Sequence, residues 1–262
     1  MKKLKDIVGV ASRGISEKFL DKYNDALLDA NPPKQAEPRE LYTPSSLGGC
    51  KRNIYYMMQG VQKEERDKSD DMTYNIVGIL ESGTDRHERI QSVLMHMEKL
   101  GYLENTDIEE YCLKMQEQGV QTHFVEWDGA EAKCKNLDAK LSFKADGLFK
   151  FENKMYIFEI KTMNIFKFKK AKAMNKPLPE HIAQATAYSI AFGIDDVIFF
   201  YEDRDFTQHL VLHYKVSDIE RKSLLAKVKK LDELLALGEL PPKETDKCMY
   251  CDYKARCKED GE

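Results

Sequence analysis

Two apolar stretches separated by only two polar residues place the strongest constraint on how this chain folds. LSFKADGLFKF (141–151) and KMYIFEIKTM (154–163) are both typical of β-strands, and Glu152–Asn153 lies between them. A two-residue turn at that point fixes the register, so that Phe149 faces Tyr156 across the pair. The sequence therefore predicts a β-hairpin with one strongly apolar face.

The same register would bring two carboxylates together. Asp146 would lie opposite Glu159, with Lys161 two positions along the same face. Opposed side chains have Cβ atoms about 5 Å apart, and two carboxylates there repel by roughly 3 kcal/mol at an effective dielectric constant of about 20. A divalent cation between the oxygens would offset this repulsion, and Mg²⁺ suits such a site. The alternative is a solvated face with ordinary charges, which we prefer only for Lys144.

Lys161 is then a candidate catalytic residue for the hydrolysis of a phosphate ester. It would orient or help to deprotonate a metal-bound water, or stabilise charge developing on the phosphate. An Asp, a hairpin and then E-x-K resembles the signature of the PD-(D/E)xK nuclease superfamily, in its RecB-like exonuclease branch, with Ala145 where proline is usual. The resemblance implies that Asp146 and Glu159 bind metal with the Ile160 carbonyl, and that Lys161 is the catalytic lysine.

The resemblance also implies the fold. It predicts an α/β (α+β) chain of restriction-endonuclease-like architecture, with a central mixed sheet flanked by helices. The order of the predicted elements, in which strands alternate with helices, favours the same class. We expect residues 1–40 to form an N-terminal helix and linker, and residues 41–262 to form the RecB-like domain.

A histidine in a helix upstream of the hairpin matches the same family. The pattern of residues 73–100 predicts a long helix whose apolar stripe includes His87. GTDRHERIQ (83–91) resembles the segment in which RecB-like nucleases place a metal-binding histidine, so the resemblance makes His87 a ligand. A histidine packed in the core is the alternative. An imidazole ligand would make the site more favourable for Mn²⁺.

A second helix, downstream of the hairpin, carries two further candidates. Residues 178–193 predict a helix with Gln184 and Tyr188 on one face, and they match the Q-x-x-x-Y motif of the RecB-like branch. These side chains would bond phosphate or the reacting water, and Tyr188 would also be able to stack on a base. The alternative is an exposed polar helix face. For His181 we expect a structural or peripheral role.

Four of the six cysteines form a pattern split between the two ends of the chain. Cys248, Cys251 and Cys257 lie close together, whereas Cys50 stands far upstream. C-x-x-C spacing is common to zinc and iron–sulfur sites, so the spacing does not choose the metal. PSSLGGCKRNIYYM (44–57) resembles the segment around the N-terminal cysteine of the iron–sulfur subset of RecB-like nucleases, which includes CRISPR-associated exonucleases.

That resemblance implies a 4Fe–4S cluster held by all four cysteines, with zinc as the alternative. The cluster would join the N-terminal helices to the C-terminal segment and close a loop of about 200 residues, whose entropy otherwise opposes docking of the two ends. Cys112 and Cys134 have no counterpart in the pattern, and we expect them to be buried as small apolar side chains.

Charge is distributed unevenly along the chain. The net charge is −4, yet residues 161–177 contain six lysines and no acid, interleaved with Phe166 and Phe168. Such a segment beside a metal site would hold a phosphate backbone, although lysine runs are more often solvated faces. No apolar run is long enough for a membrane span or a signal peptide, so we expect a cytoplasmic protein without a membrane partner.

The remaining pattern predicts further elements. We expect helices at 4–29, 43–60 and 217–237, strands at 107–114, 197–203 and 208–216, a loop at 62–71, and a poorly patterned stretch from 115 to 138.

Together these features predict a Mg- or Mn-dependent DNA exonuclease. It would process single-stranded DNA ends in recombination, replication or spacer acquisition, with proteins of those processes as possible partners. Two alternatives remain: a nucleic-acid-binding or complex-assembly subunit with little nuclease activity, and a structure-specific endonuclease. Asp146, Glu159 and Lys161 are all present, which favours an enzyme.

Overall fold

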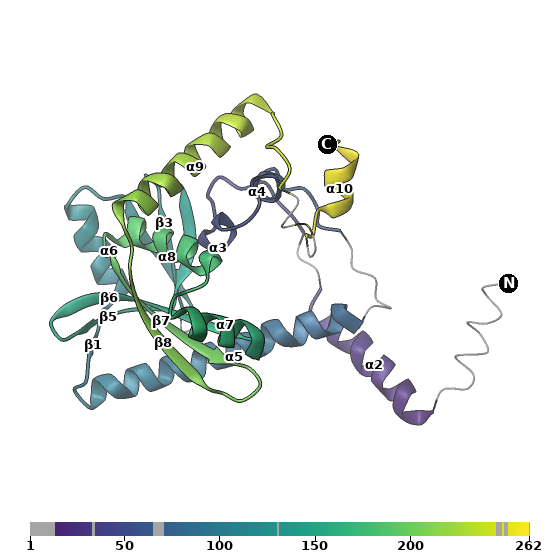
Figure 1. The fold of residues 1–262 in the computed structure, drawn as a ribbon, viewed down its shortest axis with the longest axis horizontal. Helices are drawn as coiled ribbons and strands as arrows, with labels where there is room; N and C mark the ends of the chain where they lie inside the picture. The colour runs from purple at the N-terminus through teal and green to yellow at the C-terminus, as the bar shows by residue number, and fades with distance from the viewer. Residues whose placement is uncertain are drawn as a thin grey trace. The chain divides into compact units, whose positions relative to one another are not determined.

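The chain divides into two compact units in a computed structural model that describes residues 14–32, 35–64, 71–129, 131–244, 248 and 251–261. One unit comprises 1–35 and 65–84, and its described part contains helix α2 (Ile15–Ala30) and the start of α5 (Asp71–Lys99). The other comprises 36–64 and 85–262 and carries every predicted site residue (Figure 1). The boundary predicted at residue 40 stays a prediction.

The larger unit is built on two sheets. The first has the order β1 (Glu104–Asn105), β5 (Gly147–Phe151), β6 (Lys154–Met163), β7 (Asp196–Asp203) and β8 (His209–Lys215). Only β6 and β7 are parallel, so this sheet is mixed. The second is antiparallel, with the order β2 (Thr122–Asp128), β3 (Glu131–Asn136) and β4 (Leu141–Ala145).

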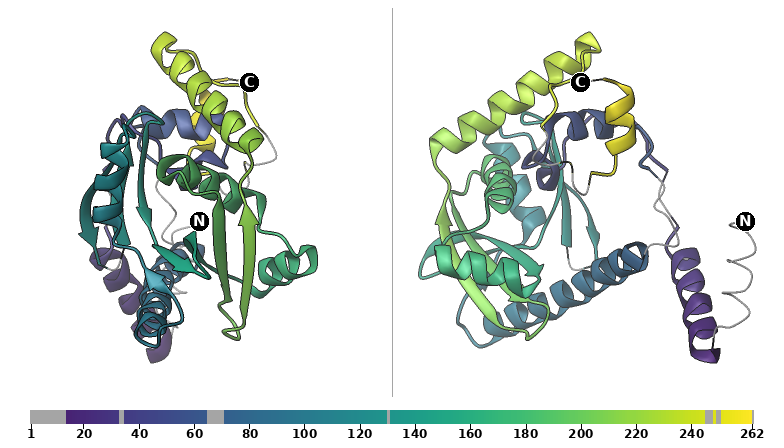
Figure 2. Two further views of the ribbon diagram at one scale, coloured as in Figure 1. Left: turned by 90° about the vertical axis from the view of Figure 1, so that its left-hand side faces the viewer. Right: turned by 45° about the vertical axis from the view of Figure 1, so that its right-hand side comes forward.

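Helices cover both faces of the mixed sheet. α8 (Pro179–Phe192) and α9 (Asp218–Leu237) lie over one face, and α5 lies over the other (Figure 2). Ile157 of β6 belongs to the core formed with α8 and α9, whereas Phe158 and Ile160 pack with Ile90 of α5. Because strand side chains alternate, Glu159 and Lys161 share the face of Ile157. This architecture confirms the predicted α/β (α+β) class with a central mixed sheet flanked by helices. None of the described helices has the length and apolar character needed to cross a membrane.

The predicted hairpin is confirmed in its outer part. β5 and β6 are antiparallel, and Phe149 pairs with Tyr156 as expected. Glu152 and Asn153 both have positive φ angles, 49° and 61°, as a tight type I′ turn requires.

The inner part of that prediction is wrong. β4 and β5 are separate strands in different sheets, and the chain passes from one to the other at Asp146. The carboxylate of Asp146 accepts the Ile160 N–H at 2.7 Å, which ends the backbone ladder between β5 and β6 at Gly147. The predicted pair Asp146–Glu159 is therefore absent from the described ladders, and Ala145 and Lys144 pair with Ala132 and Lys133 of β3.

Three other expectations need correction. The strand predicted at 107–114 is helix α6 (Ile108–Glu117), because the Asp107 carboxylate accepts the Glu110 N–H and caps it. The helix predicted at 43–60 is two helices, α3 (Pro44–Leu47) and α4 (Lys51–Met58), with Cys50 at the N-cap of α4. The poorly patterned stretch up to 138 contains β2 and β3.

The other predicted elements agree with the structure. α5, α8, α9, β7 and β8 lie where the sequence placed them, as does the described part of the N-terminal helix. Residues 4–13 of that helix and 65–70 of the predicted loop lie outside the described residues. α9 begins at a capping box formed by Ser217 and Glu220, and α8 ends at Gly193, whose φ of 66° favours glycine.

Candidate active site

A pocket of about 370 Å³ collects the predicted catalytic side chains in the larger unit. α5 contributes to it from one side, the two sheets from another, and α8 and the start of α3 complete the wall. Its lining includes His87, Glu131, Lys144, Asp146, Glu159, Lys161, Gln184 and Tyr188. The predicted residues therefore converge, although the register that first suggested this was partly wrong.

Three of these residues form a candidate metal site. His87 Nδ1 lies 3.1 Å from Asp146 Oδ1 and 3.6 Å from Glu131 Oε1, and one potential ligand atom from each residue lies within 4.8 Å of the other two. Asp146 is held in place at both ends, because its other carboxylate oxygen bonds the Ile160 N–H and its carbonyl accepts from Gln91 Nε2 at 2.9 Å. One nitrogen and several carboxylate oxygens suit Mn²⁺ or Mg²⁺.

Glu131 was not predicted as a site residue. It is the first residue of β3, and its carboxylate also lies 3.3 Å from Lys144 Nζ. In the sequence it is one of several charged residues in EAKCKN, so no motif marks it. Only the docking of β3 beside Asp146 gives Glu131 its place in the pocket.

The two carboxylates beside His87 create a negative environment that favours a bound cation. Burial lowers the pKa of His87, but hydrogen bonds to Asp146 and Glu131 outweigh it and raise this pKa to about 9. The same contact with His87 is the main cause that lowers the pKa of Glu131. A protonated imidazole between two carboxylates therefore offsets about half of their charge, and a divalent ion would offset all of it.

Glu159 and Lys161 form a buried ion pair beside this site. Glu159 is only 1% exposed, and no donor among the described residues hydrogen-bonds its Oε2 atom. Burial raises the pKa of Glu159 to about 7, and the charge of Lys161 opposes that rise. A buried carboxylate oxygen without a donor is a position that a bound cation would satisfy.

Lys161 stays protonated at neutral pH. Burial lowers its pKa, but the nearby carboxylates of Glu159 and Asp146 outweigh burial and raise it. Its ammonium group is therefore a fixed positive charge in the pocket. Of the two roles considered for it, stabilising negative charge agrees best with this state.

Gln184 and Tyr188 lie in the pocket wall but bond to the protein. Gln184 Nε2 donates to the Tyr188 hydroxyl at 2.7 Å, and that hydroxyl donates to the Lys144 carbonyl at 2.9 Å. This chain fixes α8 to β4 next to Asp146. The ring of Tyr188 packs against Phe143 and is 4% exposed, which leaves little free ring surface for stacking on a base. Direct contact of either residue with substrate stays a prediction.

His181 is bonded away from the pocket. Its Nδ1 atom lies 2.8 Å from the Tyr201 hydroxyl. Burial, with the charges of Lys161 and Lys167, lowers the pKa of His181 to about 3, so it is neutral. This agrees with the structural or peripheral role expected for it.

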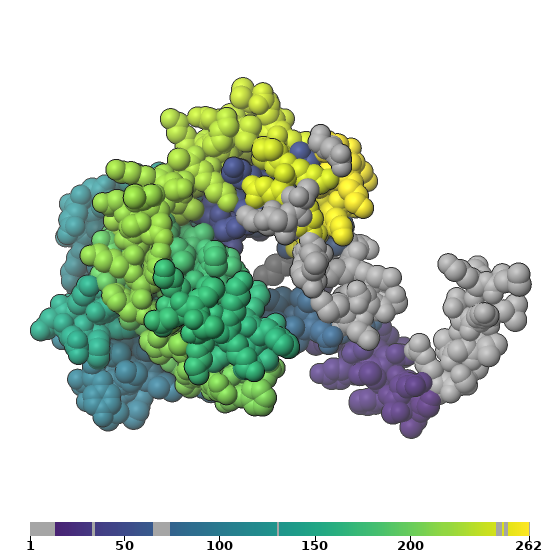
Figure 3. Space-filling view, viewed as in Figure 1, coloured from purple at the N-terminus to yellow at the C-terminus, as the bar shows by residue number. Residues whose placement is uncertain are grey.

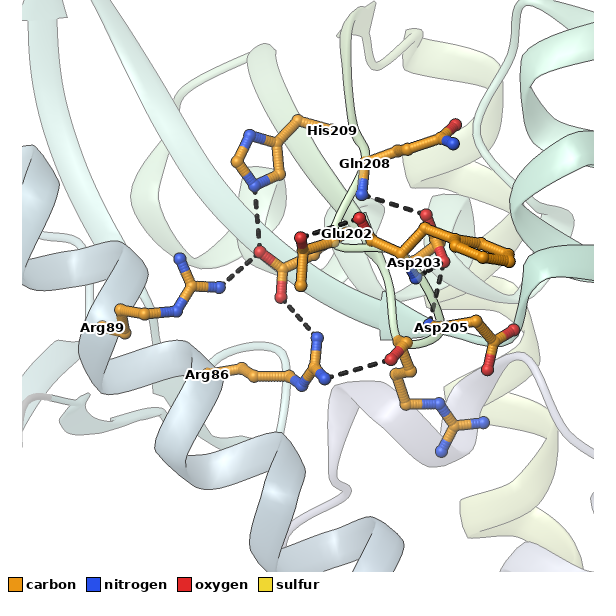
Figure 4. Close-up of polar contacts among 10 residues, drawn as sticks. Arg86, Arg89, Glu202, Asp203, Asp205, Gln208 and His209 are labelled. Atoms are coloured by element: carbon orange, nitrogen blue, oxygen red, sulfur yellow. Dashed lines mark hydrogen bonds and ion pairs between the residues drawn. The ribbon is translucent and has the colours of Figure 1, made fainter.

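A buried carboxylate anchors the segment of α5 that carries His87. Glu202, at the end of β7, accepts from Arg86 Nη1 at 2.7 Å, from His209 Nε2 at 2.9 Å and from Arg89 Nη2 (Figure 4). Arg86 also donates to the Arg204 carbonyl at 3.1 Å. Burial raises the pKa of Glu202, but these three donors outweigh it and lower the pKa. The network ties both sides of His87 to the mixed sheet, and no sequence motif marks it.

Three of the four cysteines of the predicted cluster, Cys50, Cys251 and Cys257, lie at the first turn of α4. Cys50 and Cys251 line a second pocket of about 370 Å³, and Asn53 Nδ2 lies 3.5 Å from Cys251 Sγ. Arg52 Nη1 lies 3.4 Å from Cys257 Sγ, and Cys248 Sγ lies 3.5 Å from the Glu244 carbonyl. Figure 3 shows the C-terminal segment around α10 (Lys254–Glu259), in yellow, packed against the dark blue atoms of this region.

Two of these sulfur atoms have a hydrogen-bond donor from α4, but the described thiols are not gathered around one small ion. Arg52 and Asn53 supply those donors, and donors of this kind are common around metal-binding sulfurs. Tetrahedral zinc brings its four sulfurs within about 4 Å of one another. Within the described part of the chain, no three thiols lie within 4.8 Å, and all six cysteines are free. Cys112 and Cys134 are fully buried, as expected.

No protein-family model matches this sequence, and no curated protein matches it. Among solved structures, the chain is similar to the crystal structure of SSO0001, at 18% identity and a TM-score of 0.46 over 93% of this chain and 96% of that one. It is also similar to an alkaline exonuclease from Laribacter hongkongensis, at 15% identity and a TM-score of 0.44 over 76% of this chain and 89% of that one. The same exonuclease in complex with dAMP gives 14% identity and a TM-score of 0.45 over the same shares of the two chains.

Proposed function

We propose that this protein is a metal-dependent deoxyribonuclease of the RecB-like PD-(D/E)xK type, which trims single-stranded DNA ends as an exonuclease. One observation carries the proposal. The candidate ligand set of His87, Glu131 and Asp146 shares a pocket with the buried pair Glu159–Lys161. Buried acids grouped around one lysine and one imidazole are costly unless a cation and an anionic substrate use them.

The residues that would hold a Mg²⁺ or Mn²⁺ ion are His87, Glu131, Asp146 and Glu159, with the Ile160 carbonyl by the family resemblance. When bound, the ion lowers the pKa of a water ligand and neutralises charge on the phosphodiester. Lys161 stays protonated and stabilises the negative charge that develops on the phosphate oxygens. Tyr188 and Gln184 keep α8 and β4 together, so that the pocket wall stays in place.

The test compares wild type with Lys161→Ala on end-labelled linear and circular single-stranded DNA, with Mg²⁺ or Mn²⁺. We expect wild type to degrade the linear substrate only, and chelation to stop it. Loss of the lysine should slow cleavage about 100-fold or more, because one stabilising charge is removed from the transition state.

A matched control is Lys150→Ala, which removes an exposed lysine from β5 and should leave the rate unchanged. Wild type that shows no metal-dependent cleavage would contradict the nuclease proposal. Cleavage of the circular substrate would instead indicate a structure-specific endonuclease.

We further propose that Cys50, Cys248, Cys251 and Cys257 hold a 4Fe–4S cluster that joins the C-terminal segment to α4. The Arg52 and Asn53 donors beside two of the sulfurs support this. Protein purified without oxygen should contain iron and absorb near about 400 nm. Cys251→Ala should lose that absorbance and melt at a lower temperature, whereas Cys112→Ala should keep the absorbance. A colourless protein that contains zinc would replace the cluster with a zinc site.

A further inference from the structure

Helix α7 (Ile165–Met174) presents a lysine-rich face directly after the strand that carries Glu159 and Lys161. It begins at Asn164, whose side chain caps it by accepting the Lys167 N–H at 3.0 Å. Phe168 and Ala171 are buried, so they fix which side of the helix faces the protein. Phe166, Lys169 and Lys170, at i, i+3 and i+4, therefore share the exposed side.

Most of the positive charges on this helix have no acidic partner among the described residues. α7 contains four lysines and no acid, whereas α2, α5, α6 and α9 each mix both signs. Lys167 lies 3.7 Å from Glu180, but among the described residues Lys169, Lys170 and Lys172 have no acidic partner within 4.0 Å. Like charges three or four positions apart destabilise a helix. An anionic ligand would remove that cost.

An exposed aromatic ring stands among these ammonium groups. Phe166 is 80% exposed, although Phe168, two residues on, is fully buried in the core. A single exposed apolar side chain is common on protein surfaces. A flat ring with lysines one turn further along the same face is more specific, because unpaired nucleic acid offers a base to stack on the ring and phosphates for the lysines.

The position of α7 connects this face to the catalytic pocket. Only Thr162, Met163 and Asn164 separate Lys161 from the start of the helix. Lys167 lies near Glu180 in the first turn of α8, the helix that carries Gln184 and Tyr188 into the pocket wall. α7 also lies on the face turned to the viewer in Figure 3 (green atoms).

We infer that α7 holds an unpaired DNA strand beside the pocket, with Phe166 stacked on a base and Lys169 and Lys170 bound to the flanking phosphates. The inference rests on the proposed function, and it names the residues that would select single-stranded over duplex DNA. A duplex hides the faces of its bases, so duplex DNA would use the lysines without the ring.

The test is binding of a labelled oligothymidylate and of a labelled duplex, measured by fluorescence anisotropy in EDTA so that no cleavage occurs. Phe166→Ala should weaken single-strand binding about fivefold or more, which is the loss of one stacked base, and leave duplex binding unchanged. Lys169→Gln with Lys170→Gln should reduce the salt dependence of single-strand binding by about 1.4 in log–log slope.

Two controls match these changes on α9. Ile219→Ala removes a side chain that is also 80% exposed, and Lys222→Gln with Lys229→Gln removes two exposed lysines. Neither control should alter binding. The inference is overturned if wild type does not bind the oligothymidylate, if Phe166→Ala binds like wild type, if it weakens single strand and duplex equally, or if the α7 lysine pair behaves like the α9 pair.

Failure of this inference and failure of the nuclease proposal give different results. Wild type that binds the single strand through Phe166 but never cleaves it would contradict the nuclease proposal alone. Wild type that cleaves with metal, while Phe166→Ala binds normally, would contradict the role of α7 alone.

Discussion

The two carboxylate oxygens of Asp146 make different contacts. Oδ1 faces His87 in the candidate metal site, and Oδ2 accepts the buried Ile160 N–H where the strand ladder stops. A substitution at this residue therefore affects both ion binding and backbone hydrogen bonding, and the two effects can be separated.

We expect Asp146→Asn and Asp146→Ala both to lose Mn²⁺ binding, because neither offers a carboxylate. Only alanine should also leave the Ile160 N–H without an acceptor, which costs about 1–3 kcal/mol. Asp146→Ala should thus unfold at lower denaturant concentration than Asp146→Asn, measured without metal. Equal midpoints would contradict the structural role of Oδ2.

The state of His87 predicts how metal affinity depends on pH. Its pKa is raised to about 9 in the folded protein, so its protonated form stabilises the metal-free fold fully below about pH 6.5, and this contribution is lost as pH rises through 9. A metal ion needs the neutral imidazole and must displace that proton. Apparent Mn²⁺ affinity should therefore rise with pH between about 7 and 9, by up to tenfold per unit.

Calorimetry in two buffers of different ionisation enthalpy measures the protons released on binding. About one proton per ion is expected from His87 at pH 8, because Glu159, with a pKa of about 7, is then mostly ionised. His87→Ala should bind more weakly and release none of this proton. Wild type that releases no proton would show that His87 is not a ligand.

At the scale of elements, the network around Glu202 keeps the central part of α5 against the mixed sheet. Glu202→Gln should lower the free energy of unfolding by about 3 kcal/mol or more, because two arginines lose a buried carboxylate partner. Mn²⁺ affinity should fall as well, since Arg86 and Arg89 flank His87. Urea unfolding and Mn²⁺ titration measure the two effects.

Arg89→Ala is the matched control, because this side chain is half exposed and should contribute about 1 kcal/mol or less. If Glu202→Gln leaves Mn²⁺ affinity unchanged, the network supports the fold without positioning His87.

The sequence predicted the elements with clear periodicity and missed those fixed by contacts between sheets. A two-residue turn set the β5–β6 register, and the Glu–Lys face of β6 followed from alternation. LSFKADGLFKF gave no sign of its break, because its alternation continues through Asp146 and a glycine is also tolerated within a strand. The segment that became α6 was too short for its apolar residues to distinguish helix from strand.

The candidate site was likewise predictable only where a motif carries it. His87, Asp146, Glu159 and Lys161 were identified by spacing and resemblance, and they share one pocket. Glu131 and Glu202 were not, because each gains its place only when β3 or β7 docks beside α5. Charged residues in a strand do not by themselves show which partner they will meet.

At the scale of the whole molecule, the candidate ligands come from parts of the chain that meet only through folding. His87 is on α5, Glu131 on the three-stranded sheet and Glu159 on the five-stranded sheet, while Asp146 occupies the junction between the sheets. A newly made chain whose sheets have not yet docked therefore holds these groups apart. If the proposed activity is correct, the chain becomes able to cleave DNA only after its two sheets and α5 have come together, and copies that have not reached this stage are inactive.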